Sequence, residues 1–345
     1  MSNTIEFNQA LLVPIRMTEH QWQKDTAPLV SIACITFNHE NFIRDAIEGF
    51  LQQETTFPVE ILIHDDASTD GTADVVREYE KKFPESLLPM YQKKNQFSQR
   101  INPFSDILFP RARGKYIALC EGDDYWTDPL KLQKQVDFLE THLEYSGTAH
   151  QSMVIYTDEV NKEPHLHDKH NLTDIEIDHL LNGRLFQTAS FVFRSDIIKK
   201  HTLPADITSV DRALFFLVAA CGKIHYSNEA MCCYRKHAGG LSSWVTTEML
   251  EKDLKIIPWI SQISPKFPKH KYYKFLHLVA LRHPRYLSIP KVIKHSTLYL
   301  YHSLYVGPNK FQDIKTFLAY YRPFFLPKIK QLVILKRMLK ALFMM

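Results

Sequence analysis

The sequence predicts an α/β protein whose main domain is built on a mainly parallel sheet flanked by helices. Short apolar segments alternate with stretches of helical periodicity, and acidic residues gather directly after two of the apolar segments. A change of charge along the chain predicts a separate C-terminal region. We therefore divide the 345 residues into an N-terminal leader at 1–27, an α/β domain at 28–245 and a basic, mainly helical extension at 246–345.

The first part of the α/β domain is predicted to run strand, helix, strand, helix. A mostly apolar segment at 29–35 is typical of a buried strand, and apolar residues at helical spacing follow within 42–51. The pattern repeats as a strand at 59–63 and a helix through 73–79. Strands that alternate with helices form parallel sheets, so these two strands are expected to be parallel.

A third apolar strand is predicted at 115–119, followed by an amphipathic helix from Leu132 to Leu143. Further on, the pattern favours a strand at 189–194 and a helix at 211–220. Residues 145–185 show no regular period, so they receive no assignment.

Composition narrows the class of protein. With 45% hydrophobic and 23% charged residues the chain is ordinary for a globular protein, which excludes wholesale disorder. The cysteines lack the spacing of a zinc site or a disulfide framework, and we expect all of them to be reduced, as in the cytosol. The N-terminus lacks the features of a signal peptide, and no apolar stretch is long enough to span a bilayer. These observations predict a cytoplasmic protein.

The charge is divided unevenly along the chain. Residues 251–345 hold 18 Lys and Arg against three acidic residues, although the whole chain carries a formal charge of only +4. No acidic residue follows Asp313, and cations interleave with large apolar side chains from Lys328 onward. This pattern is typical of an amphipathic segment at an anionic membrane surface, which we predict for 314–345. The alternative is a helical cap on the acidic main domain. No nucleic-acid-binding module is recognised, so no nucleic-acid partner is expected.

The acidic residues that follow two predicted strands are candidate ligands. Asp65 and Asp66 follow the second strand, and Glu121, Asp123 and Asp124 follow the third. Ligands of open parallel sheets bind at the carboxyl ends of the strands. Crowded carboxylates repel one another unless a cation compensates, so the pattern predicts a divalent ion that bridges to a phosphate-bearing ligand. The alternative is that the aspartates of the first pair only form a turn and cap the next helix.

These motifs, taken in order, carry a family resemblance. Thr36-Phe37-Asn38, then His64 through Thr72, then Gly114 through Asp124, resemble the family 2 glycosyltransferases of the GT-A fold. The resemblance is clear from Pro28 to Leu143 and weaker to Trp244. It implies an enzyme that transfers a sugar, with inversion, from a nucleotide-diphosphate donor, expected to be a UDP-sugar.

The resemblance also implies roles for residues at matching positions. Thr36 stands where the first loop of the family meets the nucleotide, and Asp66 matches the carboxylate that binds the base. Glu121 and Asp123 match the Asp-X-Asp motif, in which the first carboxylate lies near the ribose and the last binds Mn²⁺ or Mg²⁺ on the diphosphate. Glu121 departs from the motif, and the adjacent Asp124 leaves open which carboxylate binds the metal; we favour Asp123.

Two later segments match the family more loosely. Asp211 stands where the family places the general base that deprotonates the acceptor hydroxyl, with Val210 in place of the usual acid. A helix cap is the alternative role for Asp211. Arg235 and His237 resemble the late motif that closes over the diphosphate, although a flexible connection would have a similar composition.

The sequence therefore predicts an inverting, metal-dependent glycosyltransferase that acts at the cytoplasmic face of the membrane. Its expected acceptor is a glycan or lipid-linked saccharide of surface polysaccharide synthesis. One alternative is a nucleotidyltransferase of similar fold, which the lack of a glycine-rich, basic loop after Ile35 disfavours. The other is a non-catalytic protein that binds sugar nucleotides.

Overall fold

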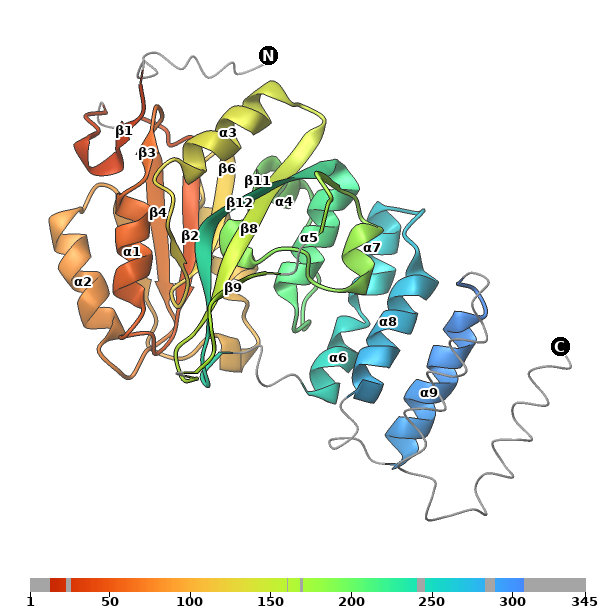
Figure 1. The fold of residues 1–345 in the computed structure, drawn as a ribbon. Coiled ribbons are helices and arrows are strands. Elements are labelled where there is room, and N and C mark those ends of the chain that lie inside the picture. The colour runs from red at the N-terminus through yellow and green to blue at the C-terminus, as the bar shows by residue number, and fades with distance from the viewer. Residues whose placement is uncertain are drawn as a thin grey trace, which may run out of the picture. The chain divides into compact units, whose positions relative to one another are not determined.

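A computed structural model gives the structure of this protein. Figure 1 shows the chain, which divides into two compact units, 1–244 and 245–345, and each is described by itself. The description covers residues 13–22, 26–159, 161–167, 170–240, 246–282 and 289–306.

The first unit is built on a mixed, mainly parallel sheet with the strand order β10-β12-β8-β11-β6-β2-β4-β5. β11 runs antiparallel to both of its neighbours and β10 antiparallel to β12, whereas the other pairs in this row are parallel. The predicted α/β class is therefore confirmed. The bounds of these strands are β2 Val30–Thr36, β4 Val59–Asp65, β5 Leu87–Tyr91, β6 Tyr116–Glu121, β8 Tyr145–Tyr156, β10 Asp174–Ile175, β11 Val192–Arg194 and β12 Lys223–Lys236.

Two short strands, β7 and β9, join this sheet, and β1 and β3 form a separate two-stranded sheet. The pairs are β1 with β3, β7 with β12 and β9 with β8, all antiparallel. Their bounds are β1 Ile15–Arg16, β3 Glu54–Thr55, β7 Tyr125–Trp126 and β9 His165–Leu166.

Helices lie on both faces of the sheet. Their bounds are α1 Ile43–Leu51, α2 Thr72–Lys82, α3 Lys131–Thr141, α4 Asp196–Lys200 and α5 Val210–Cys221. A Cβ added at Gly147 of β8 would lie 3.0 Å from Val218 of α5. The side chain of the next residue of β8, Thr148, accepts a hydrogen bond at its Oγ1 from Gln135 of α3 at 3.5 Å. Because successive side chains of a strand point to opposite faces, α3 and α5 cover opposite sides of β8.

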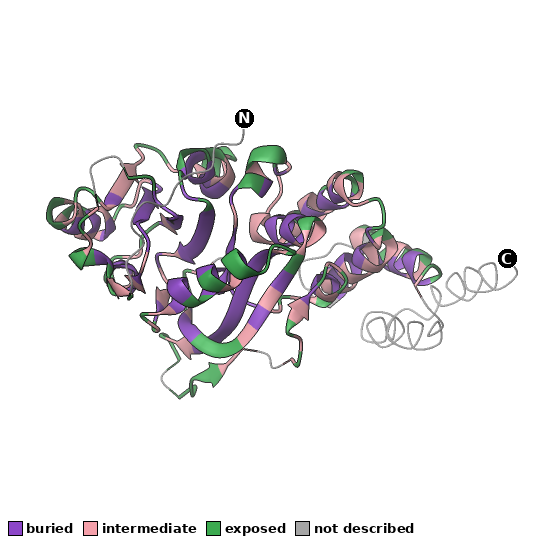
Figure 2. Cartoon of the chain, turned by 90° about the horizontal axis from the view of Figure 1, so that it is seen from above, coloured by how far each residue is buried: buried purple, intermediate pink, exposed green. Residues whose placement is uncertain are grey.

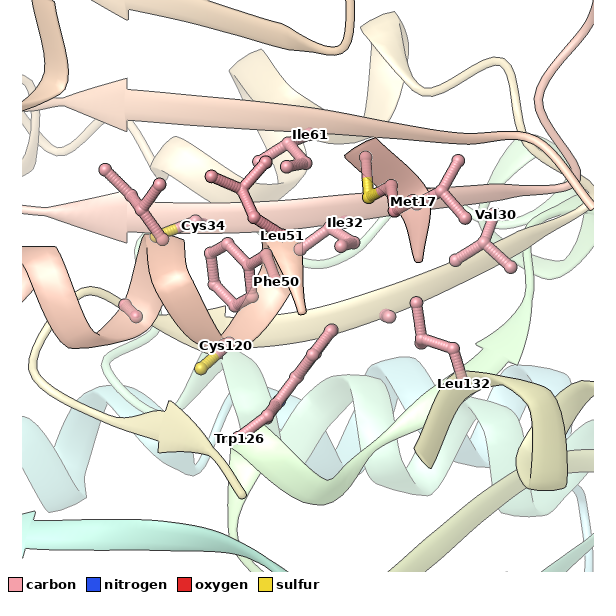
Figure 3. Close-up of a cluster of buried hydrophobic side chains, with 14 of the residues drawn as sticks. Met17, Val30, Ile32, Cys34, Phe50, Leu51, Ile61, Cys120, Trp126 and Leu132 are labelled. Carbon is pink, nitrogen blue, oxygen red and sulfur yellow. The ribbon is translucent and has the colours of Figure 1, made fainter. Parts of the chain in front are cut away.

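The core of the first unit lies between the sheet and α1, as Figure 3 shows. Trp126 packs edge-on against Phe50 at 4.8 Å between ring centroids, and its Nε1 donates to the carbonyl of Ala189 at 2.8 Å. Met17, from the segment predicted as a leader, is 4% exposed and belongs to the same cluster. In Figure 2 the buried residues are concentrated in the sheet. All five cysteines are free: Cys34, Cys120, Cys221, Cys232 and Cys233.

The two longest strands, β8 and β12, were not predicted. β8 buries Ser, Thr, His and Gln side chains along its length, so its sequence lacks the apolar pattern of a core strand. β12 contains register shifts between Ser227 and Ala230 and between Ala230 and Cys232, which interrupt any alternation. Hydrogen bonds satisfy most of the buried polar groups of β8, and those partners become visible only in the folded chain.

The described part of the second unit is helical, as predicted. Its helices are α6 Thr247–Asp253, α7 Ile256–Ile263, α8 Lys269–Arg282 and α9 Ile289–Ser303. α8 and α9 form an antiparallel pair, in which His270 meets His302 and His277 meets His295. Within the described ranges no helix is both long and apolar enough to cross a bilayer. The predicted membrane-binding segment, 314–345, lies outside the described residues.

Candidate functional site

The candidate site forms where β2, β4 and β6 end. These three strands are parallel neighbours, and their register pairs Thr36 with Asp65 and Ile35 with Glu121. The backbone continues the contact beyond the strands, because Asp66 N donates to Thr36 O at 2.9 Å and Gly122 N to Ile35 O at 2.8 Å. The acidic residues that the sequence places after separate strands therefore share one edge of the sheet.

The loops that leave β2 and β4 are tied to each other. Asn38 N donates to Ser68 Oγ at 2.9 Å, and Thr69 N donates to Asn38 Oδ1 at 2.8 Å. His39 N donates to Thr72 Oγ1 at 2.7 Å. Asn38 has a left-handed backbone with a φ of 56°, which Asn tolerates better than most residues. These bonds fix the polar turn that follows the first strand.

Three side chains from separate segments meet over this edge. Asp123 Oδ2 lies 3.0 Å from His237 Nε2 and 3.8 Å from His39 Nε2. The three ligand atoms lie within 4.8 Å of one another, which makes this group a candidate metal centre. Burial alone would raise the pKa of Asp123, but the hydrogen bond from His237 and the neighbouring His39 lower it overall. The bond to Asp123 raises the pKa of His237, whereas burial lowers that of His39.

The two carboxylates after β4 have different surroundings. Asp66 accepts hydrogen bonds from Gln96 N at 2.6 Å and Phe97 N at 3.1 Å, and its Oδ1 lies 3.3 Å from His64 Nε2. Asp65 is buried, and its Oδ1 has no hydrogen-bond partner among the described residues. Burial raises the pKa of Asp65. Asp66 thus holds the segment that follows β5, whereas Asp65 retains an oxygen free for another donor.

Asp124 and Arg235 connect β12 to the loop after β6. Asp124 Oδ1 accepts a hydrogen bond from Arg235 N at 2.8 Å, and an Arg235 Nη donates to the carbonyl of Asp123 at 3.0 Å. The guanidinium also pairs with Asp45 and lies 4.3 Å from the ring centroid of Tyr125. Burial, and then the charges of the neighbouring carboxylates, raise the pKa of Asp124. Both residues therefore brace the site, and Asp124 lies outside the three-residue cluster.

A third group of charges contains Glu121, Arg184 and Asp211. Arg184 forms an ion pair with Asp211, which lies in the first turn of α5, and donates to Gln187 Oε1 at 3.1 Å. Glu121 Oε2 is shielded from solvent without a hydrogen-bond partner in the described part of the chain. Burial, and then the charge of Asp123, raise the pKa of Glu121 to about 8, although the charge of Arg184 opposes this shift.

Asp211 also borders a hollow in the first unit. The hollow is partly open to solvent, and its lining includes Leu180, Arg184, Leu185, Asp211, Arg212 and Phe215.

Thr36 is the last residue of β2 and lies at the shared edge of the strands. It is 2% exposed, and its Oγ1 has no hydrogen-bond partner among the described residues. A Cβ added at Gly122 would lie 2.7 Å from that oxygen. Gly122 therefore allows the loop after β6 to approach Thr36.

Two residues of this site, His39 and Arg184, were missed by reasoning from the sequence, which named Asp65 only as a candidate ligand beside Asp66. His39 is a single histidine in a polar turn, and only its place directly after the first strand could have indicated a ligand. Asp65 precedes the carboxylate that matched the family, and nothing in the sequence indicates which of the two is already hydrogen-bonded. Arg184 lies in the stretch that received no assignment, so the sequence offered no signal for it.

The chain is similar to a known protein family and to several known proteins. Residues 31–201 match the family model described as glycosyl transferase family 2. An uncharacterized protein of Mycobacterium tuberculosis is 41% identical over 212 residues, which cover 61% of this chain and 60% of that protein. The Escherichia coli protein WfaP, named as a UDP-Glc:α-D-GlcNAc-diphosphoundecaprenol β-1,3-glucosyltransferase, is 26% identical over 65% of this chain and 84% of its own length.

A solved structure shares the fold. TarS 1–349 of Staphylococcus aureus, in complex with UDP-GlcNAc, superimposes with a TM-score of 0.62 at 16% identity, over 85% of this chain and 89% of that one. The predicted GT-A fold is therefore confirmed.

Proposed function

Because residues 31–201 form a family 2 glycosyltransferase domain, we propose that the chain transfers a sugar from a nucleotide-diphosphate donor to an acceptor hydroxyl. The observation that carries the proposal is the shared edge of β2, β4 and β6. There, Thr36 Oγ1 and Asp65 Oδ1 lack partners among the described residues, beside a histidine–carboxylate cluster. Buried polar atoms of this kind need a partner, and a bound nucleotide would supply it.

For the donor, we assign the base contact to the carboxylate pair after β4. The sequence favoured Asp66, but its oxygens already receive two backbone N–H groups. The unpartnered oxygen of Asp65 supports moving the contact to Asp65, with Asp66 holding the segment 95–97 beside it. A UDP-sugar is the proposed donor, which agrees with the UDP-linked sugars in the names of WfaP and the TarS complex.

A divalent ion, Mn²⁺ or Mg²⁺, is the proposed cofactor. Asp123 and His237 would hold it, and their oxygen and nitrogen atoms are suitable ligands for such an ion. When bound, the ion would neutralise charge on the diphosphate as it leaves. Asp124 was considered as a second ligand from the sequence, but its bond to Arg235 N supports a bracing role. The pairing of Arg235 with Asp45 likewise supports positioning rather than direct contact with phosphate.

Asp211 is the proposed general base. It lies at the start of α5, its carboxylate is held by the ion pair with Arg184, and both residues line the hollow described above. In an inverting transfer this carboxylate removes the proton of the acceptor hydroxyl, while the oxygen attacks the sugar carbon from the face opposite the diphosphate. Glu121 lies near the same charges, and the ribose contact predicted for it remains a proposal.

The acceptor is proposed to be a glycan or lipid-linked saccharide of surface polysaccharide synthesis. The diphosphoundecaprenol acceptor in the name of WfaP supports this class. The basic segment 314–345 would then hold the chain at the anionic cytoplasmic face of the membrane. Removing these residues should release the purified protein from anionic liposomes in a sedimentation assay. Unchanged sedimentation would reject the membrane role and leave the alternative of a helical cap.

Transfer itself is tested with a panel of nucleotide sugars, Mn²⁺ and a lipid-linked saccharide acceptor. Release of a nucleoside diphosphate is expected, whereas pyrophosphate would indicate the nucleotidyltransferase alternative. Asp211→Asn should lower kcat by roughly 100-fold or more and leave UDP binding intact, because general base catalysis typically contributes that factor. Asp196→Asn, at an exposed pair with Lys200, is the matched control. Full activity of Asp211→Asn would reject the assignment of the general base. A wild-type protein that binds UDP but transfers no sugar would favour the non-catalytic alternative.

A further inference from the structure

His39 is held in place beside Asp123 and His237 by the turn after β2. Its amide donates to Thr72 Oγ1, and its carbonyl accepts from Phe42 N at 2.9 Å and Ile43 N at 2.8 Å. The ring lies edge-on to that of His237, with 6.1 Å between centroids, and both rings contact Phe42. The backbone of His39 is therefore fixed before any ligand binds, as a preorganised site requires.

Among the described residues, neither nitrogen of the His39 imidazole forms a hydrogen bond. Its Nδ1 is buried without a partner in the described part of the chain, and its Nε2 lies 3.8 Å from Asp123 Oδ2, which is beyond hydrogen-bond range. The side chain is only 15% exposed, so water satisfies little of this demand. Nε2 therefore forms no hydrogen bond with the described residues and can bind another group.

His39 Nε2 lies close enough to Asp123 and His237 for one cation to bind all three side chains. Ligand atoms bound to one ion at about 2.1 Å lie roughly 3 Å apart. The contact between Asp123 and His237, at 3.0 Å, already has this spacing, and His39 Nε2 would need to move less than 1 Å toward Asp123 to match it. The three side chains come from three different parts of the sequence, so binding would also join these parts.

We propose that His39 is the third protein ligand of a metal site with Asp123 and His237, and that its second imidazole makes the site selective for Mn²⁺ and similar transition-metal ions over Mg²⁺. Mg²⁺ prefers oxygen ligands and retains much of its water, whereas imidazole nitrogen suits transition metals. Two nitrogens and one oxygen therefore disfavour Mg²⁺ more than the oxygen-rich set predicted from the acidic motif alone. The inference deepens the proposed function, since it specifies the ion class at the same site.

The test is metal binding by the full chain without nucleotide. Free Mn²⁺ is followed by electron paramagnetic resonance during titration, first alone and then with Mg²⁺ as competitor. The wild type should bind one Mn²⁺, and a tenfold excess of Mg²⁺ should displace less than half of it. His39→Gln should weaken Mn²⁺ binding about tenfold or more, as loss of a metal-supporting group does, and narrow the preference over Mg²⁺. His165→Gln, at an exposed position outside the cluster, is the control.

A second measurement covers the case in which His39→Gln does not fold. Pulsed electron paramagnetic resonance of Mn²⁺ on the wild type detects the remote nitrogens of coordinated imidazoles, and two are expected. The inference would be overturned if only one imidazole is detected or if Mg²⁺ competes equally with Mn²⁺. It would also be overturned if a folded His39→Gln variant binds Mn²⁺ like the wild type. A chain that binds Mn²⁺ through two imidazoles but transfers no sugar would lose the proposed function and keep this site. A chain that transfers sugar but binds Mn²⁺ through one imidazole would keep the proposed function and lose this metal site.

Discussion

Acidification should loosen the pair formed by α8 and α9, because this pair buries histidines in their neutral form. His277 and His302 are 2% and 7% exposed, and their rings stack with 5.7 Å between centroids. Burial, followed by the charges of His295 and His302, lowers the pKa of His277 to about 3. Burial and then His270 lower the pKa of His302 to about 4. Glu251 opposes the shift of His277, and Lys294 adds to it.

The sign and size of the effect follow from these values. Both pKa values are depressed below the 6.5 of a free histidine, so folding favours the neutral rings and their contribution is complete above pH 6.5. As the pH falls below 6.5, the unfolded chain takes up protons that the folded pair excludes. Each pH unit then costs about 1.4 kcal/mol per histidine, or up to about 3 kcal/mol for both between pH 7.5 and 5.5.

Hydrogen exchange measured by mass spectrometry tests this expectation. After correction for the intrinsic exchange rate, protection in α8 and α9 should fall by up to roughly 100-fold between pH 7.5 and 5.5, since about 1.4 kcal/mol is a factor of ten. Peptides from β2 and β6 serve as internal references. The double variant His277→Gln/His302→Gln should show a much smaller fall, and His165→Gln should behave like the wild type. Equal protection at both pH values, or an unchanged fall in the double variant, would refute the reasoning.

Two further predictions concern the first unit. Lys131 is fully buried, and burial lowers its pKa to about 7 from 10.5, so the free energy of unfolding should rise as the pH increases above 7. In denaturant titrations at pH 7, Lys131→Met should raise the free energy of unfolding by about 2 kcal/mol and make it depend less on pH. Lys134→Met, at an exposed position, should do neither. Gly122→Ala would place a Cβ 2.7 Å from Thr36 Oγ1 and 2.9 Å from Ile43. This substitution should lower the free energy of unfolding by about 1–3 kcal/mol and weaken UDP binding measured by calorimetry. Wild-type stability together with wild-type UDP affinity would argue against the close approach.

The sequence was sufficient to predict the strands that carry the acidic motifs. β2, β4 and β6 are nearly continuous apolar runs, because strands of a parallel sheet are buried on both faces. Since parallel strands end at one edge, the convergence of the residues after them followed from the pattern. The confirmed parts of the prediction are therefore those that depend on apolar periodicity and on the order of the motifs.

The remaining features depend on partners that are distant in sequence. The buried polar side chains of β8 are satisfied by groups such as Gln135 and the carbonyl of Val218, which no local pattern indicates. The difference between Asp65 and Asp66 arises because backbone amides about 30 residues later meet only one of them. His39 could be recognised as part of the site only once the end of β12 had placed His237 beside Asp123, and β12 itself was not predicted.

The irregularity in β12 also has a consequence for how this site can change over evolution. β12 slips in register against β8 between Ser227 and Ala230, seven residues before His237. Side chains of a strand alternate between faces, so losing or gaining one residue at the slip would turn every later side chain of β12 to the other face. Natural length variation at the slip is thus expected to occur only in pairs of residues, which couples the candidate site to an exposed stretch of strand several residues away.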